Sequence, residues 1–76
     1  DNAVALTNLA VIYMSQDKVP AALARVREAV KADPTYPNAH VLLGRLLQKT
    51  GDVPGARAAF GEAARLDKRW AAELAK

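Results

Sequence analysis

The 76-residue chain contains no cysteine and only one histidine, and few side chains therefore remain that hold metals in proteins. Without cysteine there is neither a disulfide framework nor a thiolate zinc site. The single histidine, His40, has no second histidine and no carboxylate at ligand spacing. We therefore expect His40 to be a packed structural residue, and we predict no metal and no cofactor.

The sequence patterns of common enzymes are also lacking. The four glycines are too scattered to form a phosphate-binding loop. The serine and threonines have no base partner that would activate them as nucleophiles. Glu28 and Glu62 occupy equivalent places in the two halves of the chain, where surface charges are a simpler interpretation than a catalytic pair. We therefore predict no catalytic residues and no enzymatic activity.

Long apolar runs and aromatic residues are both scarce. No apolar run approaches the ~20 residues of a membrane span, so we expect no such span, and no signal peptide is visible. Aromatic residues make up 5% of the chain, and eleven basic residues, against eight acidic ones, are spread along it with a net charge of +3. Nucleic-acid surfaces are usually denser in cations and interleaved with aromatics. We therefore expect solvated basic faces and no nucleic-acid partner.

Alanine and other helix formers dominate the chain, which favours an all-α fold. Apolar residues recur every three or four positions and predict four helices, over residues 3–15, 19–32, 37–50 and 53–66. Asn2 is suited to be the N-cap of the first helix and Asp52 that of the last. Gly51 is suited to end the third helix.

The chain repeats itself after 34 residues. When residues 3–36 are aligned with residues 37–70, nine of the 34 pairs are identical. The identical pairs are Ala5 and Ala39, Leu9 and Leu43, Val19 and Val53, Pro20 and Pro54, Ala22 and Ala56, Ala24 and Ala58, Glu28 and Glu62, Ala29 and Ala63, and Asp33 and Asp67. A fixed period of this length predicts stacked repeats.

The junction between the two copies carries the clearest turn signal. Pro34 cannot continue a helix, whereas Pro37 suits the first turn of the next one. At the second junction Lys68 replaces proline, so we expect a looser turn or a longer helix there. We expect Trp70 to cover the end of the core.

These features resemble the tetratricopeptide repeat, a 34-residue helix–turn–helix with small and large residues at fixed positions. In the first copy, these positions hold Leu6, Leu9, Ala10, Tyr13, Ala22, Val26, Ala29 and Pro34. In the second copy, they hold His40, Leu43, Gly44, Leu47, Ala56, Phe60, Ala63 and Lys68. His40 and Lys68 depart from the usual tryptophan and proline.

The resemblance implies an α-solenoid of two antiparallel helix–turn–helix repeats with a short C-terminal capping helix. We expect a single domain over residues 1–76. Repeat one would span residues 3–36, repeat two residues 37–70, and a partial or capping helix residues 71–76.

The resemblance also implies a protein–protein interaction scaffold, in which the first helix of each repeat lines a concave groove for a partner peptide. The candidate groove residues are Asn8, Val11, Asn38, Val41, Leu42, Arg45 and Lys49. Their mixed apolar and basic character favours an acidic or amphipathic protein segment. The carboxylate clamp of some family members is absent, because Thr7, Val11 and Leu42 occupy its positions. The alternative for Asn8, Arg45 and Lys49 is an ordinary solvated surface.

Self-association is the alternative function. Stacked repeats bury their apolar faces on one another, so two repeats leave an apolar flank. That flank would be covered by a longer array or in a homo-oligomer, with Trp70 and Leu74, or Leu6 and Val4, at the contact. Binding of single-stranded RNA, as in pentatricopeptide arrays, is disfavoured, because one base per repeat gives two bases here.

Overall fold

The protein folds as four α-helices in a computed structural model that describes residues 2–71. The helices are α1 (Asn2–Ser15), α2 (Val19–Ala32), α3 (Pro37–Lys49) and α4 (Val53–Leu66), followed by a short 3₁₀ helix, η1 (Lys68–Trp70). No strand is present in this range, so the all-α prediction is confirmed. The expected capping helix over residues 71–76, including Leu74, lies outside the described residues apart from Ala71.

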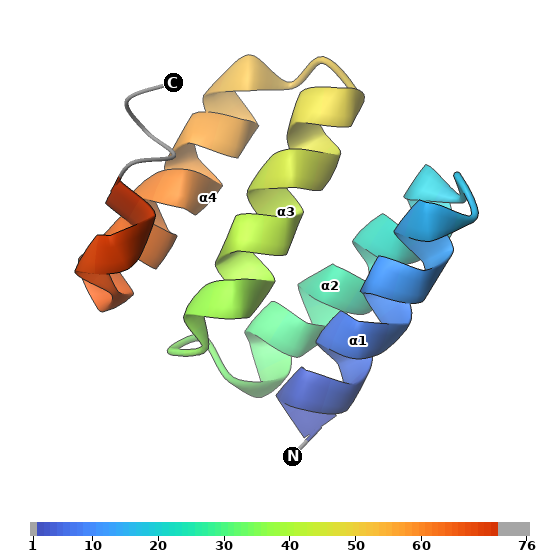
Figure 1. The fold of residues 1–76 in the computed structure, drawn as a ribbon, viewed down its shortest axis with the longest axis horizontal. Coiled ribbons are helices and arrows are strands. Elements are labelled where there is room, and N and C mark those ends of the chain that lie inside the picture. The colour runs from blue at the N-terminus through green and yellow to red at the C-terminus, as the bar shows by residue number, and fades with distance from the viewer. Residues whose placement is uncertain (1, 72–76) are drawn as a thin grey trace.

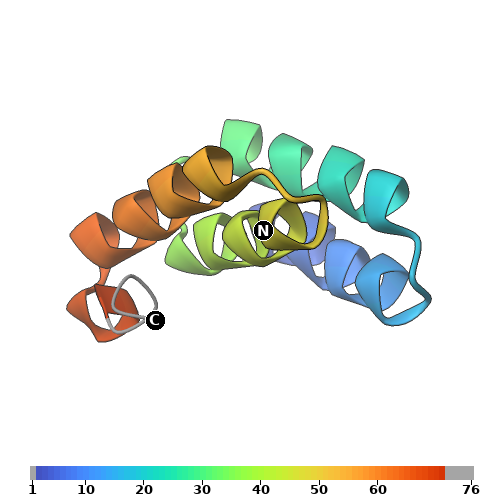
Figure 2. The same ribbon diagram turned by 90° about the horizontal axis from the view of Figure 1, so that it is seen from above.

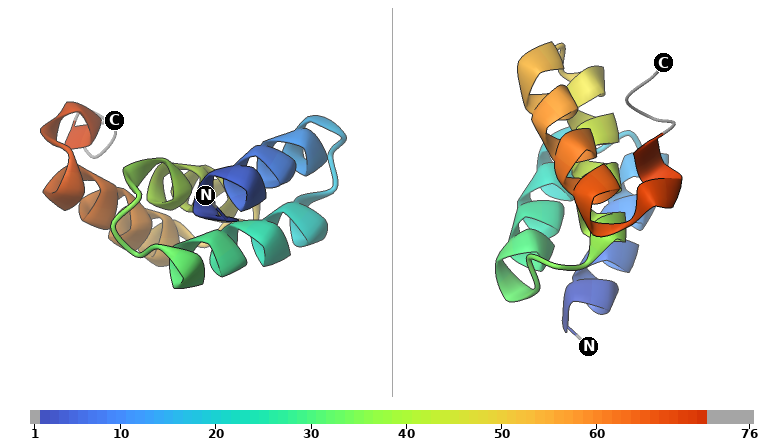
Figure 3. Two further views of the ribbon diagram at one scale, coloured as in Figure 1. Left: turned by 90° about the horizontal axis from the view of Figure 1, so that it is seen from below. Right: turned by 90° about the vertical axis from the view of Figure 1, so that its left-hand side faces the viewer.

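The helices form two antiparallel hairpins, α1 with α2 and α3 with α4 (Figure 1). Figure 2 shows α1 and α3 in one layer and α2 and α4 in the other. Helix α2 also packs against α3, which joins the two hairpins. After α4 the chain turns toward the α1/α3 layer, where η1 lies at the end of the molecule (Figure 3). None of the described helices is long and apolar enough to cross a membrane.

Both hairpins turn in the same way. Asp17 has φ 60° and Gly51 has φ 85°, and these two residues are 34 positions apart. Each is followed by a residue whose N–H donates back to the helix, Lys18 to the carbonyl of Tyr13 and Asp52 to that of Leu47, both at 2.9 Å. This is the pattern of a helix end closed by a left-handed residue.

The helix ends agree with the sequence prediction to within one residue. The Asp52 carboxylate accepts a hydrogen bond from the Gly55 N–H at 2.9 Å and so caps α4. Asn2, expected as an N-cap, is instead the first residue of α1. Helix α3 ends at Lys49, and Thr50 is its C-cap.

The core consists of two clusters, one centred on each repeat. The first contains buried residues of α1, α2 and α3, and Val26 and Leu46 are its largest fully buried side chains. The second contains buried residues of α3 and α4 around Phe60. The helices approach closely where residues are small. A Cβ at Gly44, for example, would lie 2.7 Å from the Phe60 ring.

The second junction is neither looser nor preceded by a longer helix, so that expectation is wrong. Helices α2 and α4 both have 14 residues. Asp67 adopts φ −148°, ψ 110°, close to the φ −146°, ψ 93° of Asp33. Its carboxylate accepts a hydrogen bond from the Arg69 N–H at 3.1 Å. This side-chain cap closes the turn although Lys68 stands in place of proline.

Candidate functional site

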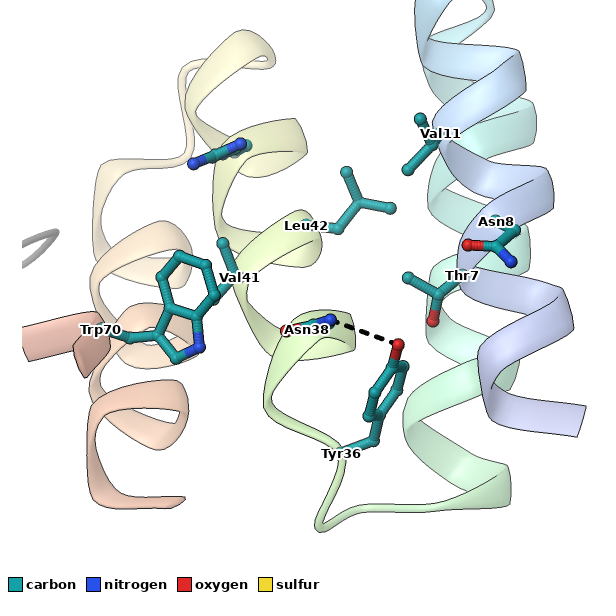
Figure 4. A pocket seen from close by; sticks show the side chains of 9 residues that line it. Thr7, Asn8, Val11, Tyr36, Asn38, Val41, Leu42 and Trp70 are labelled. Atoms are coloured by element: carbon teal, nitrogen blue, oxygen red, sulfur yellow. Dashed lines mark hydrogen bonds between the residues drawn. The ribbon is translucent and has the colours of Figure 1, made fainter. Parts of the chain in front are cut away.

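A pocket lies between α1, α3 and η1, on the α1/α3 layer of the fold (Figure 4). Nine of the described residues line it, namely Thr7, Asn8, Val11, Tyr36, Asn38, Val41, Leu42, Arg45 and Trp70. We call it the α1–α3 pocket. Its volume of about 240 Å³ is below the ~300–1,000 Å³ of typical small-molecule sites. It is therefore better suited to side chains of a longer segment than to an entire drug-sized ligand.

Helix α3 supplies the apolar floor of the pocket. Val41 and Leu42 are each 5% exposed and belong to the two core clusters, which hold them in place. Val11 of α1 points toward Leu42 across the pocket and is 45% exposed. Thr7 is buried, and its hydroxyl donates to the Ala3 carbonyl at 2.7 Å. The floor is therefore apolar in character, and the Thr7 hydroxyl hydrogen is already used within α1.

Two amides and a phenol form the polar rim. The Asn38 Nδ2 donates to the Tyr36 hydroxyl at 3.3 Å, as Figure 4 shows. Asn8 and Asn38 are exposed and line the pocket. The Trp70 Nε1 is buried and has no hydrogen-bond acceptor within the described residues. A buried N–H is costly to leave unpaired.

Among the described residues, the only charged side chain in the pocket lining is a cation. Arg45 of α3 is exposed, and no aspartate or glutamate within residues 2–71 lines the pocket. Glu28 and Glu62 lie on α2 and α4, where each pairs with an arginine three residues away, Arg25 and Arg65 respectively. The Arg65 hydrogen bond lowers the pKa of Glu62. These glutamates are therefore paired surface charges, and the described part of the pocket lining carries one positive charge.

Six of the seven groove residues predicted from the sequence line the α1–α3 pocket. The exception is Lys49, which lies at the exposed C-terminal end of α3 and does not line it. Tyr36 and Trp70 line the pocket although the sequence prediction considered only the first helix of each repeat. A usable signal existed, because Tyr36 and Trp70 are also 34 residues apart and each lies three residues after the capping aspartate.

Trp70 has two contacts at once. It packs against the second core cluster, as expected for a residue that covers the end of the core. It also faces the pocket beside Val41 (Figure 4). Its indole therefore connects the pocket to the core of repeat two.

His40 is a packed residue, as predicted. It is 7% exposed, and its Nε2–H donates to the Pro34 carbonyl at 2.8 Å, across the junction between the repeats. No group of three histidine, cysteine, aspartate or glutamate side chains within residues 2–71 is arranged to hold a metal ion.

The family model of the tetratricopeptide repeat matches residues 13–76. The chain belongs to the tetratricopeptide repeat family. The two hairpins with their 34-residue period are the architecture of this family. Tetratricopeptide repeats generally mediate protein–protein interactions and are typically non-catalytic scaffold domains. A comparison with curated proteins gives no match.

Proposed function

We propose that this tetratricopeptide repeat chain is an interaction scaffold that binds a segment of a partner protein in the groove around the α1–α3 pocket. The observation that supports this proposal is the gathering of residues from α1, α3 and η1 around one apolar floor with a polar rim. Val41 and Leu42 would contact an apolar side chain of the partner. The burial of such a side chain is worth about 1.5–3 kcal/mol.

The rim favours a segment that also carries carboxylates. Asn8 and Asn38 each offer amide donors and an acceptor for a peptide backbone. Arg45 is suited to a carboxylate, because its guanidinium presents a planar fork of donors. One arginine in the lining falls short of the six to ten phosphate contacts of typical nucleic-acid binders. The proposed ligand is therefore an acidic, apolar protein segment, and the proposal includes no catalytic step.

Selection from a displayed library of random peptides tests this function. The library is selected on the wild-type chain and on two groove variants, Leu42→Glu and Arg45→Glu. Arg57→Glu is the matched control, because Arg57 is exposed on α4 and does not line the pocket. Circular dichroism is used to check that all four proteins are equally helical, which matters most for Leu42→Glu because Leu42 belongs to the core cluster.

We expect wild-type and Arg57→Glu proteins to enrich the same peptides, with leucine or phenylalanine next to aspartate or glutamate. Leu42→Glu should abolish their binding, because it places a charge on the apolar floor. Arg45→Glu should weaken binding by about fivefold, in keeping with ~1 kcal/mol for an exposed ion pair. Peptides that bind both groove variants as tightly as the wild type would contradict the proposal.

A further inference from the structure

Helix α1 carries an exposed apolar stripe that the fold leaves uncovered. Its members are Val4, Ala5, Asn8, Val11 and Ile12, and all five are exposed. We call it the α1 stripe. Three of the four exposed large hydrophobic residues of the described chain belong to it, with exposed fractions of 38, 45 and 51%. Residues at this spacing lie on one face of a helix.

The internal repeat indicates that part of this face is suited to pack against a helix. Ala5, Asn8 and Ile12 correspond, after 34 residues, to Ala39, Leu42 and Leu46. The latter three are 0, 5 and 0% exposed and belong to the core cluster that α3 forms with α1 and α2. The other two members, Val4 and Val11, correspond to Asn38 and Arg45, which are exposed. Part of the face that α3 buries within the molecule is therefore left open on α1.

Charge favours a second copy of the same chain as the occupant. Helix α1 has no charged residue, whereas each of the other three α-helices carries at least two lysines or arginines. In a chain of net charge +3, contacts between copies through those helices would bring cations together. Contact between two α1 helices avoids this repulsion.

The α1 stripe is also symmetric about Asn8. Ala5 and Val11 lie three residues to either side of it, and Val4 and Ile12 lie four residues to either side. Two antiparallel α1 helices related by a twofold axis at Asn8 would set Val4 opposite Ile12 and each Asn8 opposite its copy. A twofold interface requires this kind of self-complementary surface. The two amides can donate to and accept from each other.

We propose that two copies of the chain associate through antiparallel α1 stripes, and that this dimer and the groove-bound complex exclude one another. The exclusion rests on the proposed function, because Asn8 and Val11 also line the α1–α3 pocket. The contact between one pair of 14-residue helices should bury less surface than the ~1,200 Å² buried in a stable complex. The dimer is therefore weak and reversible, and a partner at moderate concentration displaces it.

Sedimentation velocity from about 10 μM to about 1 mM tests the dimer without any partner. The test variant is Ile12→Lys, in the α1 stripe but outside the pocket lining. The matched control is Val53→Lys, whose side chain is 59% exposed at the start of α4. We expect the wild type and the control to approach the mass of two chains at high concentration, and Ile12→Lys to keep the mass of one.

A wild type that stays at the mass of one chain throughout would overturn the dimer. Equal dissociation of the Ile12→Lys and Val53→Lys proteins, or dimers of Ile12→Lys as tight as the wild type, would also overturn it. None of these results depends on a peptide ligand, so the proposed groove function would stand. Conversely, if the groove variants still bound the selected peptides, the proposed groove function would fail and the sedimentation evidence for the dimer would stand.

Single-cysteine variants test the antiparallel register, because the chain has no cysteine of its own. A disulfide requires Cα atoms within about 7 Å. Under mild oxidation we expect Asn8→Cys to cross-link with itself, and Ile12→Cys to cross-link with Val4→Cys but poorly with itself. Faster self-cross-linking of Ile12→Cys than of Asn8→Cys would contradict this arrangement.

Discussion

The junctions that follow α2 and α4 share one backbone conformation but are held by different side chains. The N–H of Asp33 donates to the Ala29 carbonyl at 2.9 Å, and the N–H of Asp67 donates to the equivalent Ala63 carbonyl at 2.8 Å. Tyr36 and Trp70 then close the two turns by donating to the aspartate carbonyls. The shape of the turn is therefore set by the aspartate and not by a following proline.

The attachments of the two turns differ. At the first junction the Asp33 carboxylate accepts from the Thr35 hydroxyl at 2.6 Å, and His40 of α3 binds the Pro34 carbonyl. At the second, Asp67 accepts from the Arg69 guanidinium at 2.6 Å. The first turn is thus fastened to the next helix, whereas the second is fastened only to itself within the described residues. The aspartate cap is therefore enough to form the turn. At the first junction, the hydrogen bond from His40 also fixes the turn relative to α3.

The contact between the two helices of a repeat also uses different side chains in the two repeats. Ala10 and Val26 of repeat one correspond to Gly44 and Phe60 of repeat two. In repeat two the aromatic ring lies where the Cβ of an alanine would be. A smaller residue on one helix is therefore matched by a larger one on its partner, so that the helices stay close-packed.

The largest effect on the free energy of unfolding should come from enlarging the small residue at the helix contact of repeat two. Gly44→Ala places a methyl group 2.7 Å from the Phe60 ring, which is too close for normal contact. We expect a loss of about 1–3 kcal/mol of unfolding free energy, typical of overpacking. The measurement is urea denaturation followed by circular dichroism.

Phe60→Val provides the double-mutant test of this crossing. In that background the pair becomes alanine and valine, as in repeat one, and Gly44→Ala should cost at least about 1 kcal/mol less. Gly61→Ala is the control, because its Cβ would meet no atom within 4 Å. It should stabilise α4 by about 1 kcal/mol. Equal costs of Gly44→Ala in both backgrounds would disprove the volume exchange.

The next largest effect on the free energy of unfolding should come from removing the hydrogen bond between His40 and the Pro34 carbonyl. His40→Phe keeps a ring of similar shape but removes the donor to the Pro34 carbonyl. We expect a loss of about 0.5–1.5 kcal/mol in urea denaturation, the net worth of one hydrogen bond. An unchanged midpoint would show that the turn holds α3 without this bond.

A smaller effect on the free energy of unfolding should follow when both junctions have a proline after the aspartate, or when neither has one. Lys68→Pro suits the second junction, since Asp67 is already extended, as the residue before a proline prefers. We expect a gain of about 0.4–1 kcal/mol from the reduced freedom of the unfolded chain. Pro34→Ala should lose a similar amount. Destabilisation by Lys68→Pro would show that the two turns are not equivalent.

The smallest effect should appear in acid. Hydrogen bonds from Thr35 lower the pKa of Asp33, and hydrogen bonds from Arg69 lower the pKa of Asp67. A carboxylate with a lowered pKa in the folded state stabilises the fold above its unfolded pKa of ~3.9, and this stability is lost as the pH falls through the folded pKa. Asp33→Asn and Asp67→Asn should therefore each reduce the fall in Tm between about pH 5 and pH 2.

Carboxyl carbon NMR titrations separate the two causes. Thr35→Val should raise the pKa of Asp33 alone, and Arg69→Ala should raise that of Asp67 alone. A shift at the other junction, or no shift at either, would contradict the assignment of these bonds.

The fold could be predicted from the sequence because its signals are local or repeated. The prolines, Gly51 and Asp52 mark helix ends, and the 34-residue period shows which helices are equivalent. The second junction was mispredicted, because the absence of proline was given more weight than the Asp67 cap. The place of Trp70 in the pocket was missed for a different reason. A turn residue reaches the pocket only through the packing of η1 against α4, which no local pattern encodes.

The central claim, that the α1–α3 pocket is where a partner segment binds, can be tested with the protein's own fluorescence. Trp70 is the only tryptophan in the chain, and it lines the pocket. Titration with a peptide selected on the wild-type chain should change the Trp70 emission saturably, with the same Kd as calorimetry, and Leu42→Glu should abolish the change. A peptide that binds by calorimetry but leaves the Trp70 emission unaltered would contradict the claim.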